Sequence, residues 1–274
     1  MNAAILRCMS IERSASNRVE ISEHSDFAFP GDEIIENSLY HEVVRSGYVS
    51  SVSTISGAAR SLGVAPDNET VERWKRIGAS AGLLDDFLDD SPDRDTAYSL
   101  YMQGVSGAIN MNMTTPDWID DRLPASLVLL NNSVANLPKR QIDTLRNSAL
   151  AIGEISRAKK DCSESEHYID VLRMEAHHTA TLVYESASAA MRSRPGFNEF
   201  VRWTHSALEL GTLYDSARDL SDDYREGRTS TNPNVLNCMR IAMSARFPLI
   251  SLIRDTQQRR ASRASLISRM KYSR

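Results

Sequence analysis

Cysteine, glycine and proline are scarce in this chain, and each scarcity excludes something. The 274 residues include three cysteines, Cys8, Cys162 and Cys238, which are too few and too widely spaced for a disulfide framework or a Cys-x-x-Cys metal site. We therefore expect a reducing, cytoplasmic location. The 12 glycines and 9 prolines fall mostly between long periodic segments, which favours long helices over turn-rich sheets.

Excess positive charge and long apolar runs are also missing. The 32 Lys and Arg residues against 36 Asp and Glu residues give a formal net charge of -4, so we expect no nucleic-acid partner. No run approaches the ~20 apolar residues that a membrane span needs, so we expect no stable membrane insertion. The dinucleotide, P-loop and HExxH zinc motifs are absent as well, which removes those classes of site.

What the chain does contain is ordinary globular composition with helical periodicity. Hydrophobic residues make up 41% and charged residues 25%. Apolar residues recur at steps of three and four, and no Asn-Gly or Asp-Gly hairpin signal is present. The sequence predicts an all-α protein that forms a single large helical bundle over residues 31–274, preceded by an N-terminal arm over residues 1–30.

Capping and turn residues predict where individual helices begin and end. We expect one helix over 36–61 and a second over 67–90, started by Asp67 or Asn68. Ser163 and Glu166 fit a capping box for a helix lasting to about Arg192. The remaining expected features are Pro195 in the first turn of a helix that ends at Gly227, and a last helix kinked at Pro248.

Two groups of aspartates each extend an apolar helical stripe. The first acidic cluster comprises Asp85, Asp86 and Asp89, in the string LLDDFLDD. The second acidic cluster comprises Asp215, Asp219 and Asp223, at steps of four residues. Because such steps advance ~6 Å along a helix with an offset of only ~40°, these three carboxylates form a ladder on one side.

Two interpretations of these clusters are open. In one, the carboxylates lie near solvent at helix ends and pair with Arg94, Arg218 or Arg225. In the other, both clusters face a cavity and bind a divalent cation, because unpaired carboxylates on a core-facing stripe cost several kcal/mol. Ligand sets made only of oxygen favour Mg²⁺. The presence of two such clusters favours the metal interpretation.

The DDxxD string, followed over a hundred residues later by an acidic ladder, resembles the class I isoprenoid synthases, most closely the bacterial class I terpene cyclases. The resemblance implies the class I terpenoid synthase fold and three Mg²⁺ ions that bind a prenyl diphosphate. It implies six metal ligands: Asp85, Asp86, Asp89, Asp215, Asp219 and Asp223. The string DSARDLSDDYREGR is also similar to the second motif of squalene and phytoene synthases.

Several basic residues complete the resemblance. Arg173, in the string YIDVLR, lies 42 residues before Asp215, where the cyclases carry an arginine that senses diphosphate. The alternative for Arg173 is a salt bridge to Glu166 or Asp170. With Asp85 and Asp86, Arg173 is the expected catalytic set. The expected diphosphate-binding residues are Arg173, Arg218, Arg225, Arg228 and Tyr272.

The implied function is a class I terpene synthase that ionises a prenyl diphosphate, cyclises the carbocation and releases diphosphate. The expected substrates are geranylgeranyl, copalyl-type or farnesyl diphosphate, and small residues on the presumed pocket faces favour a diterpene. A prenyl-coupling enzyme and a non-catalytic helical interaction protein are the alternatives, and a homodimer is left open. The tail from Arg254 to Arg274 carries seven basic residues and one acid, which suit diphosphate, an anionic membrane or a solvated helix face.

Overall fold

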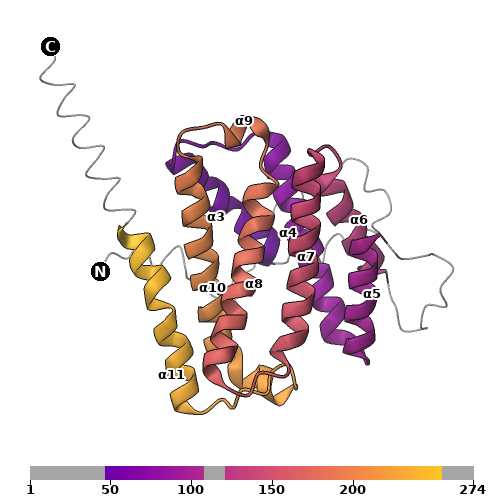
Figure 1. The fold of residues 1–274 in the computed structure, drawn as a ribbon, viewed down its shortest axis with the longest axis vertical. Helices are drawn as coiled ribbons and strands as arrows, with labels where there is room; N and C mark the ends of the chain where they lie inside the picture. Colours follow the sequence, from indigo (N-terminus) through magenta and orange to yellow (C-terminus); the bar gives the residue numbers. More distant parts are fainter. Residues whose placement is uncertain (1–46, 108–120, 255–274) are drawn as a thin grey trace, which may run out of the picture.

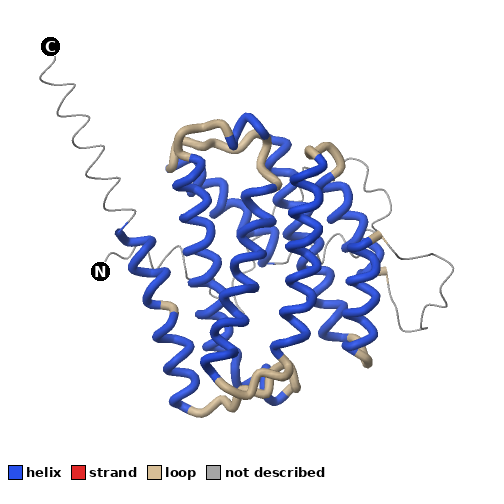
Figure 2. Tube along the Cα trace, in the orientation of Figure 1, coloured by secondary structure: helices blue, strands red, loops and turns tan. Residues whose placement is uncertain are grey.

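The computed structural model describes residues 47–107 and 121–254, and these form a bundle of helices without a strand (Figures 1 and 2). The expected N-terminal arm lies outside the described residues. The all-α prediction is thus confirmed for the described part of the chain. The helices are α3 (Gly47–Ser61), α4 (Asn68–Asp90), α5 (Arg94–Ser106), α6 (Arg122–Val134), α7 (Lys139–Lys159), α8 (Ser165–Glu185), α9 (Ala189–Arg192), α10 (Phe197–Arg225) and α11 (Val235–Ser244).

Helix α4, which carries the first acidic cluster, begins and ends as predicted. Its N-cap is Asp67, whose side chain accepts a 2.8 Å hydrogen bond from the backbone N–H of Thr70. That bond satisfies one of the donors that a helix start leaves unpaired. The preceding helix α3 ends just before Gly63, whose φ of 77° is the left-handed conformation that favours glycine.

The predicted boundaries of α8 are wrong at both ends. Its N-cap is Glu164, with no side-chain cap bond, so the Ser163–Glu166 capping box does not form. The helix ends at Glu185 because side chains from another helix bind its last turn. The indole N–H of Trp74 donates to the carbonyl of Val183 at 2.8 Å, and Arg73 donates to the carbonyl of Ser186.

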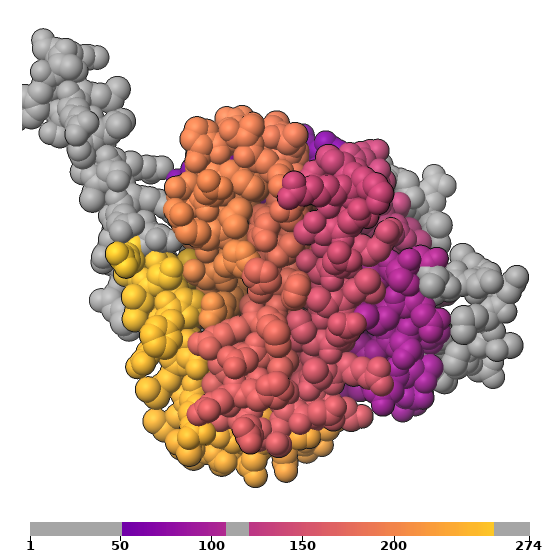
Figure 3. Space-filling view, in the orientation of Figure 1, coloured from indigo at the N-terminus to yellow at the C-terminus, as the bar shows by residue number. Residues whose placement is uncertain are grey.

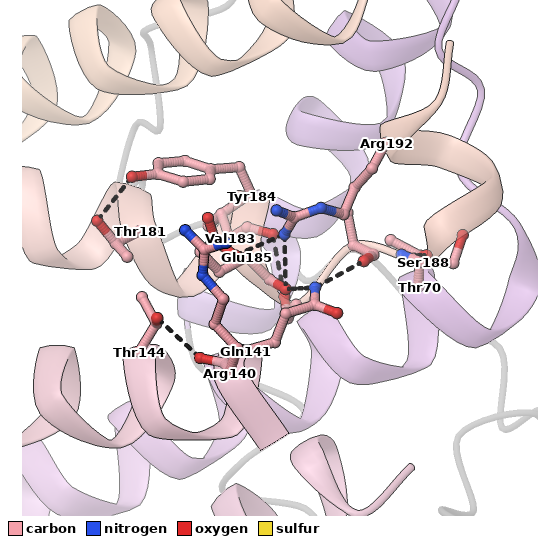
Figure 4. Close-up of polar contacts among 12 residues, drawn as sticks. Thr70, Arg140, Gln141, Thr144, Thr181, Val183, Tyr184, Glu185, Ser188 and Arg192 are labelled. Atoms are coloured by element: carbon pink, nitrogen blue, oxygen red, sulfur yellow. Dashed lines mark hydrogen bonds and ion pairs between the residues drawn. The ribbon is translucent and has the colours of Figure 1, made fainter. Parts of the chain in front are cut away.

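Helix α7 also binds this end of α8 (Figure 4). The Gln141 amide donates to the carbonyl of Glu185 at 2.5 Å, and Arg192 forms an ion pair with the Glu185 carboxylate at 2.5 Å. Two donors therefore take up polar groups of the last residue of α8. The chain then turns through the short α9 before α10 begins.

Helix α10 places the second acidic cluster. It starts at Phe197 with Gly196 as its N-cap, so Pro195 precedes the helix instead of occupying its first turn. Gly227 follows its C-terminus with a φ of 70°, as predicted. Because α4 and α10 both start at the α9 end and run the same way, both finish at the opposite end, called here the acidic end (Figure 1).

The core is made by α8 packing between α7 and α10, and by α4 packing closely on α6. The α4–α6 contact is held by small polar residues, since Ser80 and Ser126 each donate 2.8 Å hydrogen bonds to the other's carbonyl. The fully buried Leu172 and Leu213 belong to the core cluster between α8 and α10. This packing fixes the helices that carry the two acidic clusters.

The last described helical stretch, Val235–Arg254, has the length and composition of a membrane-crossing helix. Its most apolar 18 residues have a mean hydropathy of 1.2, and 17% of them are buried. The sequence is expected to hold no run that is long and apolar enough to span a membrane, and by length and composition this stretch departs from that prediction. The α-helix is interrupted at Ala245, three residues before Pro248, in agreement with the predicted kink.

Candidate functional site

The two acidic clusters meet at the acidic end through Arg228. Its guanidinium lies 3.0 Å from a carboxylate oxygen of Asp89 and 3.6 Å from one of Asp223. A further ion pair joins Arg228 to Glu226 at 2.5 Å. One cation therefore bridges carboxylates from α4 and α10, which are separated by more than 130 residues in the sequence.

Asp89, in the first acidic cluster, is held by two arginines from other segments of the chain. Besides Arg228, it accepts a 2.8 Å hydrogen bond from Arg94 at the start of α5. Its side chain keeps 32% of its exposure. Asp85 and Asp86 are exposed on the same helix. The adjacent Asp90 pairs with Arg122 at 2.6 Å.

The second acidic cluster becomes less exposed toward the end of α10. Asp215 is 63% exposed, Asp219 is 45% exposed and Asp223 is 21% exposed. Arg218 binds both carboxylate oxygens of Asp219 at 2.7 Å. Asp223 is therefore the member with the least access to water.

The arginines at the end of α10 and just after it, Arg218, Arg225 and Arg228, differ in which carboxylates they pair with. Arg225 pairs with Asp222 at 2.9 Å, and both side chains are mostly exposed. Arg218 pairs along its own helix with the second acidic cluster. Arg228 forms ion pairs with both clusters, and its Nε–H is buried without a hydrogen-bond partner among the described residues.

Burial shapes the electrostatics of the two bridged carboxylates. It raises the pKa of both Asp89 and Asp223, and the positive charge of Arg228 only partly offsets this effect. The charge of Asp89 raises the pKa of Asp223 further. Negative charge is thus held there at a cost, and additional positive charge would be favourable.

Residues outside the predicted site also lie near this end. Lys159 of α7 pairs with Glu175 of α8 at 2.5 Å, with both side chains less than one-quarter exposed. Burial, with the charges of Glu175, Asp85 and Asp89 adding to it, raises the pKa of Tyr98 to about 12. No local pattern marks these residues, because they lie on helices without an acidic stripe.

Tyr168 is another buried group near the second cluster. Burial and the charge of Asp223 raise its pKa, while a hydrogen bond with Ser216 opposes that effect. Tyr168 is 2% exposed and belongs to the core cluster between α8 and α10. The carboxylate of Asp223 therefore lies beside an aromatic side chain that is shielded from water.

Arg173 has two ion pairs on the seam between α8 and α10. Its guanidinium lies 3.2 Å from Glu209 and 3.5 Å from Asp170, and the side chain is 39% exposed. The Asp170 pair is one of the alternatives that the sequence left open. The diphosphate-sensing role of Arg173 stays a prediction, and Tyr272 lies outside the described residues.

The carboxylate oxygens at the acidic end are the type of ligand that suits a hard cation. Asp89 and Asp223 offer carboxylate oxygens, the ligand type that Mg²⁺ prefers, and they already share one cationic group. Among residues 47–107 and 121–254, no three His, Cys, Asp or Glu side chains are arranged to hold a metal. Binding a metal would therefore require Arg228 and the aspartates to rearrange.

A small hollow of about 20 Å³ lies between α5, α6 and α7, lined by Val105, Leu130, Asn131, Val134, Ile142, Leu145 and Arg146. None of these residues belongs to the acidic clusters. Its volume is below the usual range for sites that enclose a drug-sized ligand. We do not include it in the candidate site.

Comparison of the chain with protein-family models, with curated proteins and with solved structures gave no match.

Proposed function

We propose that this chain is a class I terpene synthase that ionises a prenyl diphosphate with Mg²⁺, cyclises the carbocation and releases diphosphate. The observation that supports the proposal is the meeting of Asp89 and Asp223 at Arg228. Two carboxylate groups from distant helices at one end of an all-α bundle are what binding of a metal diphosphate between them requires. We propose the synthase family and its fold for this chain together with the activity.

The proposal gives each side chain a task. Asp85, Asp86 and Asp89 on one side, with Asp215, Asp219 and Asp223 on the other, would hold Mg²⁺. When bound, Mg²⁺ would act as a Lewis acid toward the departing diphosphate. Arginine forks match phosphate oxygens in geometry, so Arg228 and Arg94 would neutralise charge on the leaving group.

The unpartnered N–H of Arg228 supports the diphosphate part of this proposal. Buried donors nearly always have an acceptor, so a donor without one among residues 47–107 and 121–254 calls for an acceptor from outside them. A diphosphate oxygen is such an acceptor, and it would be attracted by the same guanidinium. Released from Asp89 and Asp223, Arg228 would keep a partner while those carboxylates bind metal.

The test is direct incubation of the full chain with geranyl, farnesyl or geranylgeranyl diphosphate and Mg²⁺. Release of diphosphate and the hydrocarbon products would be measured, with EDTA as the metal-free reference. We expect turnover with geranylgeranyl diphosphate that requires Mg²⁺. A copalyl-type substrate would be tried alongside, because the diterpene assignment covers both.

Neighbouring residues on α10 provide a matched control. Asp223→Asn should lower turnover at least a hundredfold, because it removes charge from the least exposed ligand. Asp222→Asn changes an exposed neighbour that pairs with Arg225, and it should leave turnover unchanged. Equal activity of the two variants would remove the second acidic cluster from the site.

A second candidate is a non-catalytic helical interaction protein with solvated acids. The pairs of Arg218 with Asp215 and Asp219, in which both partners are about half exposed, favour it. This candidate predicts no product from any prenyl diphosphate. It also predicts equal melting temperatures with and without Mg²⁺ plus pyrophosphate, whereas joint binding would raise the melting temperature by mass action.

A further inference from the structure

Helix α11 and the helical residues 246–254 that follow it expose a row of large apolar side chains to solvent. These side chains are 51–76% exposed and recur at helical steps: Val235, Leu236, Met239, Met243, Phe247 and Ile250. They make up six of the nine exposed large hydrophobic residues in the described part of the chain. We call these six residues the outer stripe.

The opposite side of the same segment is already occupied. Ile241 and Ala245 are buried in the core cluster against α8 and α10, with Cys238, Leu249 and Leu252 partly buried beside them. The segment is therefore apolar on two sides. The inner side fixes it along one edge of the molecule, seen in yellow in Figure 3, and the outer stripe has no neighbour among the described helices to cover it.

Charge is strongly segregated along this sequence. Ten of the 32 basic residues and one of the 36 acidic residues follow Glu226, so the last 48 residues carry a formal charge of +9 and the first 226 carry -13. Within 231–254 the charged residues are Arg240, Arg246 and Arg254, with no acid. All three are exposed, and Arg246 lies over the ring of Phe247 at 4.7 Å.

A partner for this surface has to be both apolar and anionic. A second copy that paired the outer stripes face to face would bring two sets of arginines together, and like charges repel. A nucleic acid would match the charge but would leave the outer stripe against water. An anionic lipid bilayer offers acyl chains to the stripe and headgroup charge to the arginines.

We propose that the outer stripe with Arg240, Arg246 and Arg254 docks this protein reversibly on an anionic membrane surface. The helix would lie in the plane of the interface instead of crossing the bilayer. Crossing would require Ile241 and Ala245 to leave the core and would bury arginines in hydrocarbon. None of the residues of this surface belongs to the two acidic clusters, and docking does not depend on the proposed catalytic activity.

The test is co-sedimentation of the full chain with vesicles of phosphatidylcholine alone or with 30% phosphatidylserine added. We expect at least tenfold tighter binding to the anionic vesicles, and release in 0.5 M NaCl, which screens the attraction. The paired substitution Met243→Ser and Phe247→Ser should weaken binding at least tenfold. Arg246→Gln should weaken it roughly fivefold, the factor that corresponds to about 1 kcal/mol per basic residue.

Met174→Ser is the matched control, because Met174 is 47% exposed on α8 and is not part of the outer stripe. It should bind vesicles like the wild type, and all variants should melt like the wild type. A Phe247→Trp variant gives a second readout, since brominated lipids should quench the introduced indole if the stripe enters the interface.

Three results would overturn the proposal. One is equal binding to neutral and anionic vesicles, or binding to neither. Another is anionic binding that the paired substitution leaves unchanged. The third is vesicle-free association, with a second copy or with a nucleic-acid duplex, that the paired substitution abolishes.

Discussion

Removing the charge of Arg228 tests whether the two acidic clusters act on one another. In an Arg228→Gln variant, Asp89 and Asp223 would lose the cation that they share. Exposed ion pairs contribute about 0.2–1 kcal/mol, and breaking a buried pair costs about 3–5 kcal/mol. Arg228 is 37% exposed and its two partners 21–32%, so solvent screening places the loss between these limits, at about 2 kcal/mol.

The assay is thermal unfolding at pH 7.5 and at pH 5. A loss of about 2 kcal/mol corresponds to a fall of roughly 4–8 °C in melting temperature for a chain of this size. Carboxyls whose pKa is raised on folding bind more protons when folded than when unfolded. The charge of Arg228 lowers both pKa values in the wild type, so its removal should raise them further. Acidification from pH 7.5 therefore stabilises the variant more than the wild type, and the deficit of the variant should be smaller at pH 5.

Added Mg²⁺ should stabilise the Arg228→Gln variant more than the wild type, because Arg228 no longer competes for the same carboxylates. The control is Arg225→Gln, which removes a mostly exposed charge paired with Asp222 and should change stability by less than about 0.5 kcal/mol. If Arg228→Gln melts like the wild type, and neither protein responds to Mg²⁺, the two clusters do not form a shared site.

Three further predictions concern single residues. Asp219→Asn should lower activity sharply and recover partly at high Mg²⁺; superimposable Mg²⁺ titrations with the wild type would return Asp219 to a surface role. Asp67→Ala should cost about 1–2 kcal/mol in denaturant unfolding, because it removes the N-cap of α4. Burial raises the pKa of Asp67, but hydrogen bonds from Ser188 and Thr70 outweigh burial and lower this pKa overall. The stabilisation by Asp67 should therefore be lost only as pH falls below about 3.8. Burial, and secondly the charge of His177, lower the pKa of His205 below 6.5, so stability should fall as pH drops through 6.5, and His205→Gln should flatten that dependence.

Several helix ends could be predicted from the sequence, because they depend on capping residues next to them in the chain. Asp67 before an apolar periodic segment predicted the start of α4, and Gly227 predicted the end of α10, because capping depends on a few adjacent residues. The boundaries that failed depend on distant residues. Helix α8 ends at Glu185, where Trp74, Arg73 and Gln141 donate hydrogen bonds to its last carbonyls. The sequence of α8 itself does not indicate these distant donors.

The candidate site divides in the same way. Helical spacing alone determined that Asp215, Asp219 and Asp223 share one side of a helix, because that relation needs only the 3.6-residue period. The convergence of α4 and α10 was decided by tertiary packing, and with it the bridge from Asp89 through Arg228 to Asp223. Only packing could separate the buried Ile241 from the exposed Met243 two residues later, because an apolar residue reads the same in sequence whether a neighbouring helix covers it or not.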